Sequence, residues 1–136
     1  MRMIRRSLLV VVLALSMVAG GMTTASAAVR VLDAYCSPSG DYCTFVLRRD
    51  HTIIFKIRAF ADYFGTADAC VTKETRVCHS RSPQEAADGI YQWSIRWQGN
   101  YPREGAGIYT VRWLDESGDR IGKALHFERR SGSPTG

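Results

Sequence analysis

Apolar side chains recur at every second position over most of the chain. The clearest runs lie at residues 43–48, 51–60, 90–97 and 108–114, with a final run ending at Phe127. This alternation is typical of β-strands that have one buried and one solvated face. No segment has a convincing helical period, and only residues 82–88 (SPQEAAD) are expected to form a single helical turn, with Pro83 at its first position. The sequence therefore predicts an all-β protein.

Turn residues separate these runs at short intervals. Arg49-Asp50, Asp88-Gly89 and Ser117-Gly118-Asp119 stand between successive strands, which favours hairpins and antiparallel pairing. Six to eight short strands in one domain are typical of an antiparallel β-sandwich. A small closed barrel is the alternative that this pattern leaves open.

The four cysteines lie in two close pairs, each of which flanks a turn. The pairs are CSPSGDYC (Cys36 and Cys43) and CVTKETRVC (Cys70 and Cys78). An even count of cysteines in an exported chain predicts disulfides, and the two local pairings are preferred among the three connectivities. Structural zinc usually requires closer spacing. Each short loop is expected to add about 2–3 kcal/mol of stability.

The first 27 residues have the pattern of a secretory signal peptide. The start MRMIRR is basic, an apolar run follows, and Ala25 and Ala27 form an A-x-A box, so we expect cleavage after Ala27 and no membrane insertion of the mature chain. An uncut membrane anchor is the alternative. Cleavage would leave one β-sandwich domain at residues 28–129 and a disordered tail at 130–136, in a secreted, extracellular protein.

The charge of the chain gives little support to a nucleic-acid partner. The whole chain has a net charge of +5, but three arginines lie in the predicted signal peptide, which leaves 15 basic and 13 acidic side chains, or +2. No nucleic-acid-binding motif accompanies these residues. We therefore expect no nucleic-acid partner.

The stretch GIYTVRWLDESGDRIGKALHF (108–128) predicts the closing hairpin of the sandwich. Tyr109 follows a corner rich in proline and glycine, as does the tyrosine corner of immunoglobulin-like sandwiches, whose hydroxyl bonds back to the upstream backbone. Trp113 lies on the same face as Tyr109, and both are assigned structural roles. Gly122 is expected to permit a bend or bulge in the last strand.

These residues carry a family resemblance. The hairpin resembles the ends of exported bacterial immunoglobulin-like domains, among them mostly uncharacterised small secreted proteins of actinobacteria. It is also similar to the last hairpin of CopC-like periplasmic copper carriers, and this similarity is carried by Gly107, Tyr109, Val111, Trp113, Gly122 and Phe127. The copper ligands of those carriers are missing, because Ser117-Gly118-Asp119 occupies the turn and the predicted mature chain begins at Ala28. The resemblance implies the fold and does not carry copper binding.

The sequence shows no catalytic or metal-binding constellation. His51, His79 and His126 are far apart and form no ligand motif. There is no G-x-S-x-G motif, paired cysteines leave no thiol nucleophile, and the acidic residues lie mostly in turns. We predict neither an enzyme nor a cofactor or metal.

The aromatic residues divide into two groups. Tyr91, Trp93, Trp97 and Trp113 share the inward positions of strands and are assigned to the core. Phe60, Tyr63 and Phe64 occur in the loop segment AFADYFGTADAC, and Tyr101 lies in a later loop. These four form the candidate binding surface for a sugar or a protein. The alternative is that the first three pack beneath the hairpin at 70–78.

These observations predict a secreted binding module without catalytic activity. Its partner would be a cell-envelope polymer or an extracellular protein. The alternative is a secreted protease inhibitor that presents residues 79–89 or 98–107 as an extended loop. This alternative is suggested by the size, export signal and two disulfides, features in which the chain is similar to Streptomyces-type subtilisin inhibitors.

Overall fold

The computed structural model describes residues 28–130, which form nine strands and no helix. The strands are β1 (Val29–Cys36), β2 (Tyr42–Arg49), β3 (Thr52–Ala59), β4 (Ala67–Thr72), β5 (Arg76–Arg81), β6 (Gln84–Ala87), β7 (Ile90–Trp97), β8 (Gly107–Leu114) and β9 (Arg120–Arg129). The predicted all-β class is confirmed. β1 is an additional strand that the alternation does not single out.

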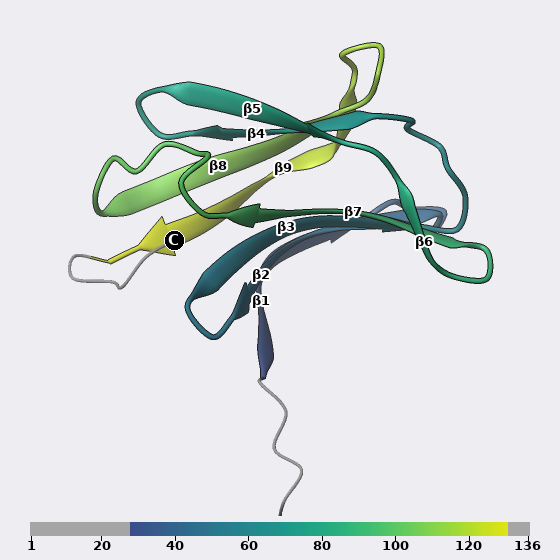
Figure 1. Cartoon of the computed structure of the whole chain (residues 1–136), viewed down its shortest axis with the longest axis horizontal. Coiled ribbons are helices and arrows are strands. Elements are labelled where there is room, and N and C mark those ends of the chain that lie inside the picture. The colour runs from purple at the N-terminus through teal and green to yellow at the C-terminus, as the bar shows by residue number, and fades with distance from the viewer. Residues whose placement is uncertain (1–27, 131–136) are drawn as a thin grey trace, which may run out of the picture.

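The strands form two antiparallel sheets that lie one over the other (Figure 1). One sheet has the order β1-β2-β3-β7-β6 and the other the order β5-β4-β8-β9. The chain changes sheet after β3, after β5 and after β7. This connectivity is that of the immunoglobulin-like sandwich, with β1 added at the edge of the larger sheet. Two separate sheets exclude the closed barrel.

The core lies between the sheets and is rich in aromatic side chains. Trp93, Trp97 and Trp113 are at most 2 % exposed, as expected from their positions, whereas Tyr91 is half-buried. The Trp93 indole N–H donates a hydrogen bond to the carbonyl of Gly65 at 2.7 Å. Because this bond joins a core side chain to the loop after β3, it holds that loop against the end of the sandwich.

The pairing of β2 with β3 decides which side chains of β2 point into the core. Val46 lies opposite Phe55 and Thr44 opposite Ile57, and all four are fully buried. Paired residues of neighbouring strands project to the same face of a sheet. The more apolar set, Cys43, Phe45 and Leu47, therefore lies on the outer face of the larger sheet, where it is half-buried.

The closing hairpin has the tyrosine corner that the sequence predicts. The Tyr109 hydroxyl donates a hydrogen bond to the carbonyl of Gly105 at 2.8 Å and accepts one from the Glu104 N–H at 2.9 Å. Gly122 has a positive φ of 70° within an irregularity in the β8–β9 register, as expected for a bulge. Tyr109 and Trp113 are both buried.

The predicted helical turn at 82–88 is wrong. Residues Gln84–Ala87 form β6, in which Gln84 pairs with Gln92 and Glu85 with Tyr91 of β7. The free edge of β7 offers backbone hydrogen bonds to an adjacent segment. A segment this short makes few helical hydrogen bonds of its own, so pairing with the edge is preferred.

Both disulfides have the predicted local pairing. Cys36–Cys43 joins β1 to β2, and Cys70–Cys78 joins β4 to β5. Neither bond links the two sheets. The predicted signal peptide at 1–27, and the predicted tail apart from Arg130, lie outside the described residues. Among residues 28–130 there is no helix that could span a membrane.

Candidate functional site

The structure divides the predicted aromatic surface into exposed and packed residues. Phe60 is 65 % exposed and Tyr63 51 % exposed. Phe64 is half-buried instead, because its ring packs edge-on against Tyr42 at 5.1 Å and Trp93 at 5.4 Å between ring centroids. Phe60 and Tyr63 therefore have the exposure that the expected surface requires. Phe64 is packed, as in the alternative, but against side chains of β2 and β7 and not beneath the hairpin at 70–78.

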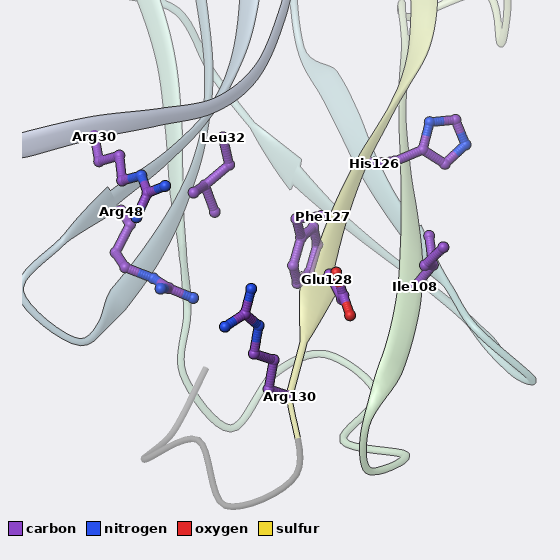
Figure 2. Close-up of a pocket in the computed structure, with 8 residues that line it drawn as sticks. All are labelled: Arg30, Leu32, Arg48, Ile108, His126, Phe127, Glu128 and Arg130. Carbon is purple, nitrogen blue, oxygen red and sulfur yellow. The ribbon is translucent and has the colours of Figure 1, made fainter.

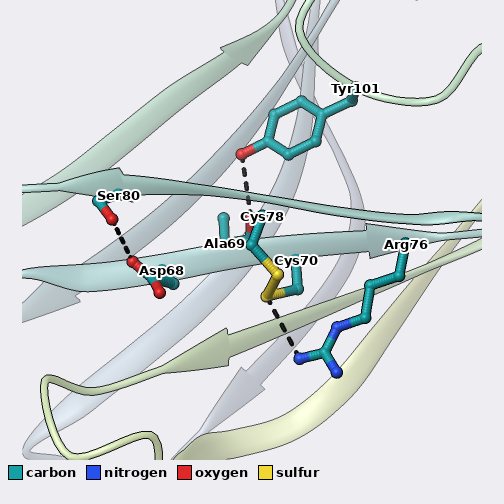
Figure 3. The surroundings of a disulfide bond; sticks show 7 residues. All are labelled: Asp68, Ala69, Cys70, Arg76, Cys78, Ser80 and Tyr101. Atoms are coloured by element: carbon teal, nitrogen blue, oxygen red, sulfur yellow. Dashed lines mark hydrogen bonds between the residues drawn. A yellow bond between two sulfur atoms is a disulfide. The ribbon is translucent and has the colours of Figure 1, made fainter.

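Tyr101 does not belong to this surface. It is 4 % exposed, its ring packs edge-on against Phe55, and its hydroxyl donates a hydrogen bond to the carbonyl of Ala69 at 3.2 Å (Figure 3). Burial, and then the neighbouring Asp68 carboxylate, raise the pKa of Tyr101 well above its ordinary value. The loop that carries Tyr101 folds inward, and the prediction that it is a surface contact is wrong.

Phe60 borders a small apolar hollow, which we call the aromatic hollow. It has a volume of about 260 Å³. Its lining comes from the turn between β1 and β2, from β2 itself and from the end of β3, namely Gly40, Tyr42, Cys43, Phe45, Arg58, Ala59 and Phe60. The Phe60 N–H donates a hydrogen bond to the carbonyl of Asp41 at 3.1 Å, which fixes the end of β3 beside the turn. The aromatic hollow thus has a fixed backbone frame and one prominent exposed ring.

A second hollow, the arginine groove, lies on the side of the sandwich where β1 and β2 approach β9. It has a volume of about 440 Å³. Its lining consists of Arg30, Leu32, Arg48, Ile108, His126, Phe127, Glu128 and Arg130 (Figure 2). None of its arginines is a site residue predicted from the sequence. They are separated by up to 100 positions, and no sequence motif joins them.

A third hollow of about 570 Å³ lies on the opposite side, between β5 and β7. Its side chains largely bond to the protein itself. The Arg81 guanidinium donates to the carbonyl of Ser94 at 2.9 Å, and His79 Nε2 hydrogen-bonds the carbonyl of Asn100. These contacts join β5 to the larger sheet and its following loop, so they stabilise this side of the sandwich.

The loop acids have structural partners. Asp115 Oδ1 accepts hydrogen bonds from the N–H groups of Ser117 and Asp119, as turn acids commonly do. Glu116 accepts from the Thr66 N–H at 3.1 Å, which ties the turn between β8 and β9 to the loop after β3. Within residues 28–130, no group of three or more histidine, cysteine or acidic residues has the arrangement of a metal site.

The two segments proposed as inhibitory loops are held by the fold. Within 79–89, residues 79–81 belong to β5, and Gln84–Ala87 forms β6. Within 98–107, Tyr101 and Pro102 are buried, and Glu104 accepts hydrogen bonds from the Glu74 and Thr75 N–H groups in the turn between β4 and β5. The Thr75 hydroxyl also donates a hydrogen bond to Glu104. This bond, followed by the bonds from the N–H groups, lowers the pKa of Glu104.

Comparison of the chain with protein-family models, with curated proteins and with solved structures finds no match.

Proposed function

We propose that this protein is an exported binding module that acts without catalysis. The basic and apolar start followed by an A-x-A box supports export. The two disulfides are compatible with an oxidising compartment. The immunoglobulin-like sandwich supports binding, because the rigid sheets hold the loops at their ends in fixed positions.

The single observation that carries the proposal is the exposure of Phe60 and Tyr63 at one end of the sandwich. A ring that is 65 % exposed loses the stabilisation that burial would provide, and large exposed apolar groups are typical of binding surfaces. Phe60 stands at the edge of the aromatic hollow, next to Arg58. An aromatic face and a guanidinium together can stack on and hydrogen-bond a hydroxyl-rich ring.

The ligand that best fits this arrangement is a sugar-containing polymer of the cell envelope. The aromatic hollow is smaller than the roughly 300–1,000 Å³ of typical small-molecule pockets, so it accepts one ring-sized group. A polymer can add further contacts, among them one with Tyr63, through neighbouring units. An extracellular protein is the alternative partner.

The test uses the oxidised chain of residues 28–136, immobilised and incubated with cell-wall material and with culture fluid. Phe60→Ala and Tyr63→Ala should each reduce the retained polymer at least about fivefold, because each variant removes a contact worth about 1 kcal/mol or more. The matched control is Val31→Ala, because Val31 is 54 % exposed and lines neither the aromatic hollow nor the arginine groove. All three variants should keep the wild-type melting temperature within about 2 °C.

Two outcomes would contradict the proposal. Retention of polymer that is unchanged in both aromatic variants would remove the aromatic end from the binding surface. Retention of a single protein in place of polymer, lost in the same variants, would assign the surface to a protein partner. Phe64→Ala should not be used for this purpose, since loss of its packing on Trp93 lowers stability directly.

A further inference from the structure

We propose that the arginine groove is a second binding site, which takes a linear polymer carrying phosphate or carboxylate groups. The proposal goes beyond the binding module described above, because it uses other residues on another side of the sandwich. None of the eight residues that line the arginine groove lines the aromatic hollow.

Two of the arginines project to the inward face of the larger sheet, Arg48 in line with buried residues of β2 and Arg30 opposite it on the edge strand β1. Arg48 follows Thr44 and Val46 on the inward face of β2, and it pairs with Ile53, which is 1 % exposed. Arg30 pairs directly with Arg48 across β1 and β2, so both side chains project to the same face. Like charges directly opposite each other in a sheet are destabilising. An anionic ligand between the two guanidinium groups would offset this repulsion.

The third arginine comes from the other sheet. β9 ends at Arg129, whose guanidinium lies 5.0 Å from the centre of the Trp97 ring. This contact fixes the end of β9, and the next residue, Arg130, enters the arginine groove. Figure 2 shows the guanidinium groups of Arg48 and Arg130 directed into the same space, with Arg30 close to Arg48. Three positive charges thus gather in one hollow.

The lining of the arginine groove holds one acidic side chain, Glu128, against three arginines. The one ion pair between side chains of residues 28–130 joins Lys73 to Glu74. Asp33 lies on β1 close to the arginine groove, but its two carboxylate oxygens accept hydrogen bonds from the N–H groups of Ala34 at 2.9 Å and His126 at 2.8 Å. Glu128 is the only acid in the lining, and no ion pair joins it to any of the three arginines.

The chemistry of the ligand follows from this lining. A guanidinium presents a planar fork of N–H donors that matches the oxygens of a phosphate or a carboxylate. Leu32 and Ile108 add apolar surface, which suits the carbon backbone of a polymer between its anionic groups. Arg30, Arg130, Ile108 and His126 are exposed, so the arginine groove is open enough for a chain to lie along it.

The experiment measures binding of the oxidised chain of residues 28–136 to poly(glycerol phosphate), to poly(glutamate) and to neutral dextran by isothermal titration calorimetry. We expect binding to one or both anionic polymers, none to dextran, and weaker binding as salt rises from about 50 to about 200 mM. The two anionic polymers distinguish phosphate from carboxylate as the group that is recognised.

Variants separate the arginine groove from net charge. Arg48→Gln and Arg130→Gln should each weaken binding about tenfold, whereas Arg120→Gln, an equal change of charge at an exposed site outside the groove, should weaken it less than about twofold. Arg130 follows the last strand, so its variant keeps the fold even if Arg48→Gln does not. Glu128→Gln should strengthen binding, because it removes the only acid in the lining.

Equal losses in Arg120→Gln and Arg130→Gln would overturn the proposal, since binding would then reflect charge alone. Absence of binding to both anionic polymers would overturn it as well. Phe60→Ala should leave binding to these polymers unchanged, and Arg130→Gln should leave Phe60-dependent retention of wall material in place. Failure of one proposal is therefore distinguishable from failure of the other.

Discussion

The Tyr109 hydroxyl should contribute about 2 kcal/mol to the free energy of unfolding through the two hydrogen bonds of the tyrosine corner. In Tyr109→Phe the ring keeps its packing against Phe127 and Trp97, whose ring centroids lie 5.3 Å and 5.0 Å from the centroid of the Tyr109 ring. Only the hydroxyl is lost, and with it the hydrogen bonds to the Glu104 N–H and the Gly105 carbonyl. Each bond of this kind contributes about 1 kcal/mol, so the free energy of unfolding should fall by about 2 kcal/mol.

The assay is guanidinium unfolding of the oxidised protein, followed by tryptophan fluorescence. For a domain of this size, a loss of 2 kcal/mol corresponds to a melting temperature lower by roughly 8–16 °C. The matched control is Tyr63→Phe, because Tyr63 is 51 % exposed and its hydroxyl makes no hydrogen bond within residues 28–130. It should change the free energy of unfolding by less than about 0.5 kcal/mol.

Hydrogen exchange locates the effect. The Glu104 amide should exchange faster in Tyr109→Phe by more than the global loss of stability accounts for, because its acceptor is gone. A loss below about 0.5 kcal/mol, or a Glu104 amide whose exchange follows the rest of the molecule, would refute the role of Tyr109 in holding the loop before β8.

Three further predictions concern single side chains. Thr44 is fully buried and its hydroxyl has no hydrogen-bond partner within residues 28–130, so Thr44→Val should raise the free energy of unfolding by about 1 kcal/mol in the same assay. Burial, with the charge of the neighbouring Asp68 carboxylate, raises the pKa of Tyr101 in the folded state. As pH rises, the unfolded chain therefore loses the Tyr101 hydroxyl proton before the folded protein does. The free energy of unfolding should fall above about pH 10 for this reason. Tyr101→Phe should flatten that fall in urea unfolding measured between about pH 9 and about pH 11. Gly122→Ala should lower the free energy of unfolding by more than about 1 kcal/mol, and by more than Gly118→Ala does. Both glycines have a positive φ, but only at Gly122 would the new Cβ lie 2.7 Å from the Tyr35 ring. An equal loss of stability in the two variants would contradict this steric explanation.

Local chemistry in the sequence determined much of this fold. Alternation of apolar residues identified the β class because side chains of a strand alternate between its faces in any tertiary context. The two disulfides were predicted because each pair of cysteines flanks a short turn, so that strand pairing brings the two residues together. Tyr109 was predicted because its corner depends on neighbours only four and five positions upstream.

The candidate sites depended on contacts that no local pattern contains. Phe60 and Phe64 come from the same short loop, yet one is exposed and the other packs on Trp93. Residues 82–88 have a helical start signal but became strand β6, because β7 had a free edge to pair with. These outcomes were decided by elements distant in sequence.

The arginine groove also depends on contacts between elements that are distant in the sequence. The alternation in β2 is compatible with either face pointing inward, and its more apolar set is Cys43, Phe45 and Leu47. The register with β3 turns Thr44, Val46 and Arg48 inward instead. The end of β9 then brings Arg130 to the same hollow from the other sheet. The sequence by itself determined the strands, the turns and the disulfides, because these depend on near neighbours. Only the tertiary structure decided which charges meet, because facing and register are set by pairing between strands that are far apart in the chain.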